Sequence, residues 1–219
     1  MTIHPDFAYV YTRANEMLVK SHLVQNFPFA IHDLIREQTT LKLVSFSQAQ
    51  LLGLQVEDLG SDSAVLVSIH GKEVLFYNDS HTKARNRFNL AHEFGHYVCE
   101  HDLGTESAEL YGVYEVEANY FAAQLLMPQQ ILYSFQQRGI RLTEDFIVEH
   151  FGVSGEAARR RLDTLSKTNF RWYSDEEKEF DDAILFRYQQ FIQQVCPPSH
   201  RDFLYEEEER QRERDTWFR

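Results

Sequence analysis

The chain has few cysteines, a minority of basic residues and no long apolar segment. Its two cysteines, Cys99 and Cys196, are too few for the disulfide framework of a small secreted protein, and they fit a reducing cytosol better. No apolar run approaches the ~20 residues of a membrane span, and residues 1–10 lack the basic and apolar regions of a signal peptide. We therefore expect a soluble cytoplasmic protein.

The charge balance is acidic, with 34 Asp and Glu against 22 Lys and Arg and a formal net charge of −12. Nonspecific binding to phosphate backbones relies on Lys and Arg, so direct nucleic-acid binding is not expected. Hydrophobic residues make up 43% of the 219 residues. That is enough for one domain with a sizeable core and a small appendage.

The spacing of apolar residues predicts an α+β protein with many helices and a small sheet. Alternating side chains over 40–46 and 63–77 predict strands, and the turn His70-Gly71-Lys72 makes the second range a hairpin. Residues 206–219 are rich in Glu and Arg and form either a solvated helix or a disordered end. The period of 3.6 residues predicts helices over residues 6–22, 29–36, 83–101, 114–127, 129–138, 142–165 and 183–195, with breaks at Gly139 and Gly152.

Residues 92–96 read His-Glu-Phe-Gly-His, which fits the pattern H-E-x-x-H. On a helix, His92 and His96 lie one turn apart on the same face, so their imidazoles can bind one Zn²⁺. Glu93 lies beside them, and its carboxylate can take a proton from a metal-bound water. The alternative is a surface helix with two solvated histidines. An apolar opposite face and Gly95, which lets another element approach closely, argue against it.

The third ligand is expected from the segment 115–119, because a Glu completes the His₂Glu type of catalytic site. Two glutamates compete for this role. Glu115 shares its helix face with small or polar residues, so that face can approach the active helix closely. Glu117 shares its face with bulkier residues, which would hold the helices further apart. The sequence thus favours Glu115 and leaves Glu117 as the alternative.

A more distant alternative is Asp102, ten residues after His92, where H-E-x-x-H-x-x-G-x-x-H/D proteases place their last ligand. Those proteases need a glycine where this chain has Cys99, which we expect to be a small buried residue. His101 and Asp102 are therefore interpreted as solvated loop residues.

Hydrolysis at such a metal site also needs a side chain that donates to the oxyanion formed from the attacked carbonyl. The sequence does not choose among the candidates, which are Tyr111, Tyr114, His101 and His150. Asn89 and Asn119 can orient the metal ligands by hydrogen-bonding to them.

Three segments, residues 85–96, 115–128 and 151–162, together resemble the ImmA/IrrE family of zinc metallopeptidases. The resemblance covers about residues 6–166. It implies a minimal zincin-like α+β core over 1–139 and a helical, helix-turn-helix-like extension over 140–168. Residues 169–219 form a charged C-terminal helix or tail that matches nothing in the family.

The resemblance also implies a site and a function. His92, His96 and Glu115 would hold Zn²⁺, and Glu93 would be the catalytic base. Some family members look like proteases that cut phage-type helix-turn-helix repressors, which derepresses mobile-element or stress genes. We therefore expect a zinc endopeptidase with a protein substrate, in an oligomeric state that the sequence does not indicate. The alternatives are a DNA-binding regulator that uses residues 142–165, including Arg159-Arg160-Arg161, and an inactive zinc-stabilised toxin–antitoxin partner.

Overall fold

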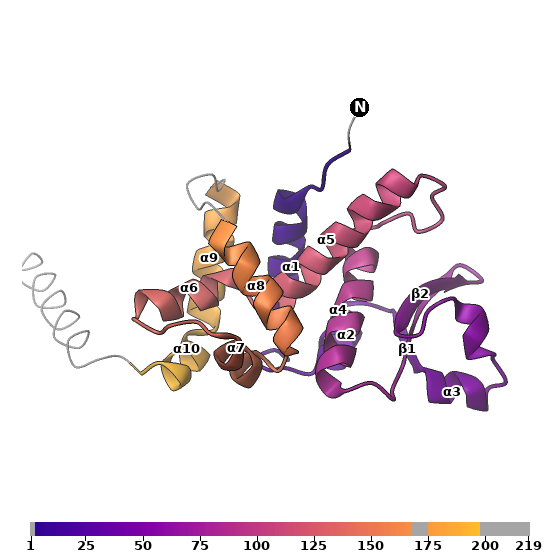
Figure 1. Cartoon of the computed structure of the whole chain (residues 1–219), viewed down its shortest axis with the longest axis horizontal. Coiled ribbons are helices and arrows are strands. Elements are labelled where there is room, and N and C mark those ends of the chain that lie inside the picture. The colour runs from indigo at the N-terminus through magenta and orange to yellow at the C-terminus, as the bar shows by residue number, and fades with distance from the viewer. Residues whose placement is uncertain (1–2, 168–174, 198–219) are drawn as a thin grey trace, which may run out of the picture.

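The computed structural model describes residues 3–167 and 175–197 (Figure 1). These residues form a mixed α+β fold with a small sheet, which confirms the predicted fold class. The helices before the H-E-x-x-H motif are α1 (Phe7–Lys20), α2 (Ile31–Gln38), α3 (Phe46–Leu51) and a 3₁₀ helix, η1 (Val56–Leu59). The motif and its partner segment lie on α4 (Lys83–Val98) and α5 (Ala108–Leu126). The later helices are α6 (Gln129–Gln137), α7 (Glu144–Phe151), α8 (Gly155–Lys167), α9 (Asp175–Arg187) and α10 (Gln189–Val195).

The sheet has the order β1-β3-β2, built from β1 (Lys42–Ser45), β2 (Ala64–Ile69) and β3 (Lys72–Tyr77). β1 pairs with β3 in parallel, and β2 pairs with β3 as the predicted antiparallel hairpin. His70 and Gly71, which join β2 and β3, both have positive φ. Two such residues make the tight hairpin turn whose twist matches that of the strands. Figure 1 shows the sheet and α3 at one end of the molecule, with α4 and α5 beside them.

α4 is fixed in the fold at its start and along one face. The Thr82 side chain caps its first turn by accepting from the Arg85 N–H. The Arg87 guanidinium donates to the carbonyl oxygens of Phe29 and Phe151, and its burial lowers the pKa to about 10. Apolar residues of the predicted inner face, Leu90, Ala91, Phe94 and Val98, lie in the main core. The polar face of α4 is thereby held in one orientation.

Several helix boundaries differ from the predicted ones for identifiable reasons. α5 begins at Ala108 rather than Tyr114, because the Ser107 side chain caps it by accepting from the Leu110 N–H. α3 was not predicted, although Ser45 and Gln48 form a capping box that the sequence displays. The break expected at Gly152 within the helical segment 142–165 is confirmed, since α7 ends there, α8 begins at Gly155, and Gly152 has φ of +63°.

Side chains from all three predicted parts of the chain share one hydrophobic core. Ala158 of α8 and Ile184 of α9 are fully buried in it together with α1, α4 and α5. Tyr188, which separates α9 from α10, donates from its hydroxyl to the Leu18 carbonyl oxygen of α1 at 3.2 Å. The predicted boundaries at 139 and 168 stay predictions. Residues 206–219 lie outside the described residues.

The basic triplet Arg159-Arg160-Arg161 lies on α8 and is only partly exposed. Arg161 is only 1% exposed, and it donates to the Met127 carbonyl oxygen at 3.0 Å and to the Gln124 side chain. Arg160 is exposed and pairs with Glu156 at 2.6 Å. One member of the triplet therefore belongs to the core.

Among the helices of residues 3–167 and 175–197, none is long and apolar enough to cross a membrane.

Candidate metal centre

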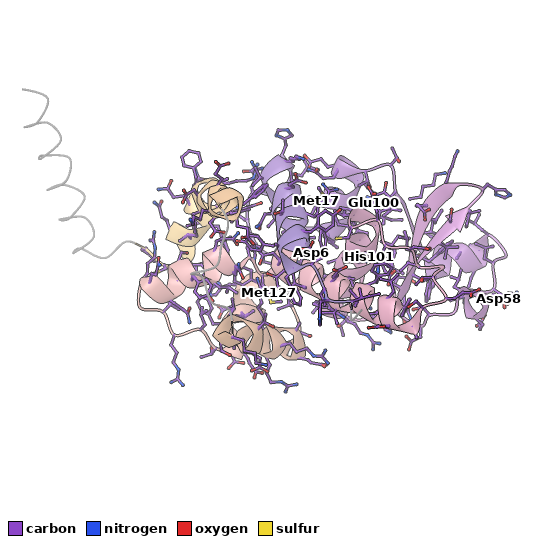
Figure 2. All side chains as sticks on the ribbon, turned by 90° about the horizontal axis from the view of Figure 1, so that it is seen from above. Asp6, Met17, Asp58, Glu100, His101 and Met127 are labelled. Carbon is purple, nitrogen blue, oxygen red and sulfur yellow. The ribbon has the colours of Figure 1, made fainter. Side chains whose placement is uncertain are left out.

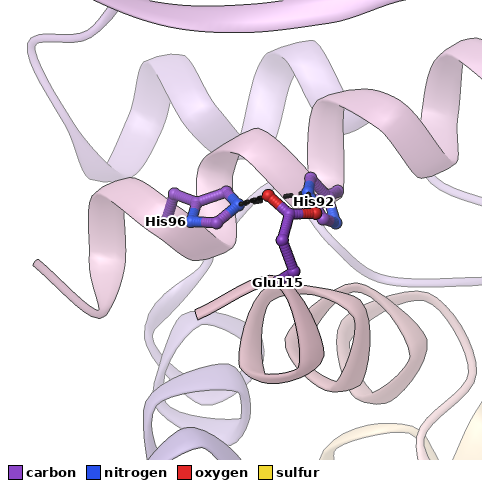
Figure 3. A group of neighbouring side chains, drawn as sticks. All are labelled: His92, His96 and Glu115. Atoms are coloured by element: carbon purple, nitrogen blue, oxygen red, sulfur yellow. Dashed lines mark hydrogen bonds and ion pairs between the residues drawn. The ribbon is translucent and has the colours of Figure 1, made fainter. Parts of the chain in front are cut away.

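Three side chains from two helices converge at one point (Figure 3). His92 and His96 extend from α4, and Glu115 extends from α5 towards them. The two Nε2 atoms are 3.1 Å apart, and a different carboxylate oxygen of Glu115 lies 3.4 Å from each of them. Ligand atoms at ~2.0–2.1 Å from a tetrahedral zinc are about 3.3 Å apart, so the spacing fits this ion. The chemistry of the donors, two imidazoles and one carboxylate, fits as well.

The protonation states at this point also suit a metal. Burial lowers the pKa of His96 to about 3, and the neighbouring His92 acts in the same direction. The hydrogen bond from His92 lowers the pKa of Glu115 to about 2. A neutral imidazole and an ionised carboxylate are the forms that bind a cation. His96 and Glu115 therefore each offer a lone pair to a cation at neutral pH.

Glu93 lies beside the three donors and is held by the sheet. Its Oε2 accepts from the Leu66 N–H of β2 at 3.0 Å. Burial raises the pKa of Glu93 to about 7. A carboxyl group whose pKa is near neutral can both accept and release a proton under physiological conditions, as general acid–base chemistry requires.

The two other proposed ligands lie elsewhere. Glu117 is 7% exposed and accepts from the Asp6 N–H at 2.6 Å and from His101 Nε2 at 3.0 Å. Asp102 is exposed, and its carboxylate accepts from the Gly104 N–H at 3.0 Å. The close approach of α4 and α5 occurs at Gly95, against Phe121. The structure places Glu115, the favoured glutamate, beside the histidines, but α4 and α5 approach most closely at a bulky side chain and not on the small-residue face that the sequence argument used.

The interpretation of His101 as a solvated loop residue was wrong. Its side chain is 3% exposed, and its ring stacks on Tyr114 with centroids 4.4 Å apart and planes at 12°. Its Nδ1 lies 2.9 Å from Nδ1 of His96, whose other ring nitrogen, Nε2, faces His92 and Glu115. Burial lowers the pKa of His101. Figure 2 labels His101 together with Asp6, whose backbone is bound by the same Glu117.

The candidate oxyanion donors separate clearly. The Tyr111 hydroxyl hydrogen-bonds the Glu115 carboxylate, and burial raises the pKa of this tyrosine. Tyr114 and His101 are engaged with each other. His150 lies on α7, where its ring contacts Phe146 at 4.4 Å. Tyr111 is therefore the candidate that reaches the site.

The two asparagines predicted to orient ligands do not bind the ligand side chains. Asn119 donates from Nδ2 to the main-chain carbonyl oxygen of Glu115 at 2.7 Å. The Nδ2 of Asn89 is buried and has no hydrogen-bond partner among the described residues. As predicted, Cys99 is buried, which raises its thiol pKa to about 12.

A groove of about 860 Å³ begins one helical turn from the three converging side chains. Asn89 precedes His92 by one turn and Asn119 follows Glu115 by one turn, and both line the groove. Its far wall is α8. Apolar and charged side chains line it, among them Phe88, Val116, Tyr120, Arg85 and the ion pair of Arg160 with Glu156.

Comparison with known proteins agrees with this geometry. A search of curated proteins gives no match. The model of a peptidase family, Peptidase_M78, described as the IrrE N-terminal-like domain, matches residues 49–163. This range is more than half of the chain and contains α4, α5 and all three converging side chains. The chain therefore belongs to the ImmA/IrrE family of metallopeptidases.

Proposed function

We propose that this protein is a zinc-dependent endopeptidase in which His92, His96 and Glu115 hold the metal. The observation that carries the proposal is the spacing of the three donors, 3.1 to 3.4 Å, in a member of a metallopeptidase family. Zinc bound there would polarise the scissile carbonyl and lower the pKa of a bound water towards ~7.

Glu93 is the general base of the proposed reaction. Its carboxylate takes a proton from the attacking water and passes it to the leaving amine nitrogen. The Leu66 N–H binds Oε2 of Glu93, which fixes the orientation of the carboxylate. The Tyr111 hydroxyl, next to Glu115, is the proposed donor to the oxyanion. Each role thus has one named side chain.

The substrate is proposed to be a polypeptide. β2 is an edge strand, because the sheet order is β1-β3-β2, and its Leu66 lies against the base. An extended chain paired with this edge by strand addition would pass the metal-binding side chains. The 860 Å³ groove offers room for side chains of such a segment, and Arg85, which lines it, favours an acidic group there.

From the family resemblance we propose that the substrate is a phage-type helix-turn-helix repressor in the cytoplasm, whose cleavage derepresses its genes. The DNA-binding alternative is weaker, because Arg161 is buried and Arg160 is paired with Glu156. The net charge of −12 also opposes it. A toxin–antitoxin partner would keep the zinc but would have no need of Glu93.

The experiment combines metal analysis with cleavage. The purified protein is expected to contain one zinc per chain and to cut a phage-type helix-turn-helix repressor at one peptide bond, identified by mass spectrometry. A chelator should stop cleavage, and added zinc should restore it. Cleavage that continues after complete zinc removal would refute the proposed function. A salt-dependent gel shift with operator DNA tests the regulator alternative, for which no binding is expected near physiological salt.

A further inference from the structure

The position of His101 is set by the way α4 ends. The His101 N–H donates to the His96 carbonyl oxygen at 3.0 Å, and the Glu100 N–H donates to the Tyr97 carbonyl oxygen at 3.3 Å. These two bonds define a Schellman motif, in which the first residue after the helix C-cap adopts a left-handed conformation. That residue is Glu100, with φ of +57°, where glycine is usual. The reversal returns His101 to the side of His96.

α5 holds the His101 ring in this position through two side chains. Tyr114 stacks on the flat face of the ring. Glu117, one helical turn further on, accepts from His101 Nε2 at 3.0 Å. The other oxygen of Glu117 accepts from the Asp6 N–H at 2.6 Å, at the residue that caps α1. Both oxygens of this buried carboxylate are therefore occupied by donors.

These contacts point to one arrangement of the protons on the two imidazoles. An ionised carboxylate only accepts, so Nε2 of His101 carries a hydrogen, and Nδ1 of the neutral ring is then an acceptor. Nδ1 of His96, 2.9 Å away, must therefore be the donor. A neutral His96 with its proton on Nδ1 has its lone pair on Nε2, the atom that faces His92 and Glu115.

We propose that Glu117 and His101 are positioning residues that fix the tautomer and ring orientation of His96 for metal binding. This inference rests on the proposed function of His96 as a ligand. Groups that hold the free nitrogen of a ligand histidine commonly change metal affinity ~10- to 100-fold when they are removed. Here His96 contacts a second histidine, His101, which contacts Glu117. Glu117 also binds the backbone at the start of α1, so the N-terminal helix is linked to the proposed metal site.

The most direct test is Glu117→Gln, which preserves size but can accept from only one of the two donors. If the amide oxygen binds the Asp6 N–H, the amide group donates to His101 and reverses both tautomers. We expect zinc affinity, measured by competition with a chromophoric chelator, to fall ~10- to 100-fold. In the metal-free protein, long-range ¹H–¹⁵N spectra should show the His96 proton moving partly from Nδ1 to Nε2, a change that a merely structural role would not cause.

Glu109→Gln is the matched control. Glu109 also lies on α5 and accepts from a backbone N–H of the N-terminal segment, that of Ile3 at 3.4 Å, but it has no contact with His101. It should leave zinc affinity and the His96 spectrum unchanged. His101→Phe is a second variant that keeps the stack on Tyr114 and should reproduce the loss of affinity if Glu117→Gln does not fold.

The inference is overturned if folded Glu117→Gln and His101→Phe bind zinc within about 2-fold of the wild type and leave the proton of His96 on Nδ1. If the wild-type protein binds no zinc, the proposed metal site itself fails. The spectra of the metal-free protein still decide in that case whether Glu117 sets the tautomer. The two failures are therefore distinguishable.

Discussion

Gly95 lies against the ring of Phe121 so closely that a Cβ atom on the glycine would be 3.0 Å from Cδ1. Phe121 is fully buried and cannot move aside freely. The contact sets the distance between α4, which carries His92 and His96, and α5, which carries Glu115. A glycine in the middle of a helix is thus explained by the helix packed against it.

Gly95→Ala should lower the free energy of unfolding by ~1 kcal/mol, because overpacking costs ~1–3 kcal/mol and outweighs the better helix propensity of alanine. Gly112→Ala on α5 is the control, since its Cβ would meet nothing within 4 Å. That change should raise the free energy by ~0.5–1 kcal/mol. Urea denaturation measures both. A stabilised Gly95→Ala would show that the helices are not in contact there.

Glu115→Ala should lower zinc affinity by more than the ~10- to 100-fold expected for an outer contact, because it removes one of three donors. Asp102→Ala, at an exposed position that the sequence also offered, should leave the affinity unchanged. Chelator competition on both variants provides the comparison. Zinc loss in Asp102→Ala alone would move the metal site to the loop after α4.

Filling the groove should weaken substrate binding without affecting the metal. Val116, 44% exposed, lines the groove, whereas Val148, 36% exposed, lies on α7 outside it. Val116→Trp should reduce kcat/KM for a polypeptide substrate by ~10-fold or more, since a single misfit in a binding pocket costs ~1–3 kcal/mol. Val148→Trp should have no effect. Equal rates for both variants would exclude the groove from substrate recognition.

The pH dependence of stability has a contribution from His32, which lies on α2 away from the metal centre. Burial, followed by the charge of Arg36, lowers the pKa of His32 below its usual 6.5. As pH falls through about 6.5, His32 is protonated in the unfolded chain but stays neutral in the folded chain. The free energy of unfolding therefore falls as pH falls through this range. His32→Phe should lose less stability between about pH 7.5 and 5.5 than the wild type. Urea denaturation of both proteins at several pH values measures this. An equal loss of unfolding free energy over this pH range in both would contradict the prediction.

Local helix geometry made the central site predictable from the sequence. His92 and His96 share a face because they are four residues apart, and Glu115 was favoured over Glu117 because its face carries small residues. These arguments need only the helical period and the size of the neighbours. The structure brings these three side chains together, while their role as ligands stays a prediction.

The surroundings of the site depend on contacts that no local pattern encodes. Glu117 binds Asp6, 111 positions away along the chain, and α9 closes onto α1 through Tyr188 and Leu18. The left-handed residue of the Schellman motif that positions His101 is Glu100. Glycine is usual at that position, so the sequence lacked the signal that would have predicted this helix end. His101 therefore looked like a solvated residue in the sequence.

The measurement that tests the central claim most directly is Glu93→Gln. The amide keeps the size of the side chain but cannot accept the water proton, and Glu93 is not one of the three converging donors. We expect wild-type zinc content and a ~10²- to 10⁴-fold loss of cleavage, the usual contribution of a general base. Cleavage at the wild-type rate with zinc still bound would contradict the assignment of Glu93 and the mechanism built on it.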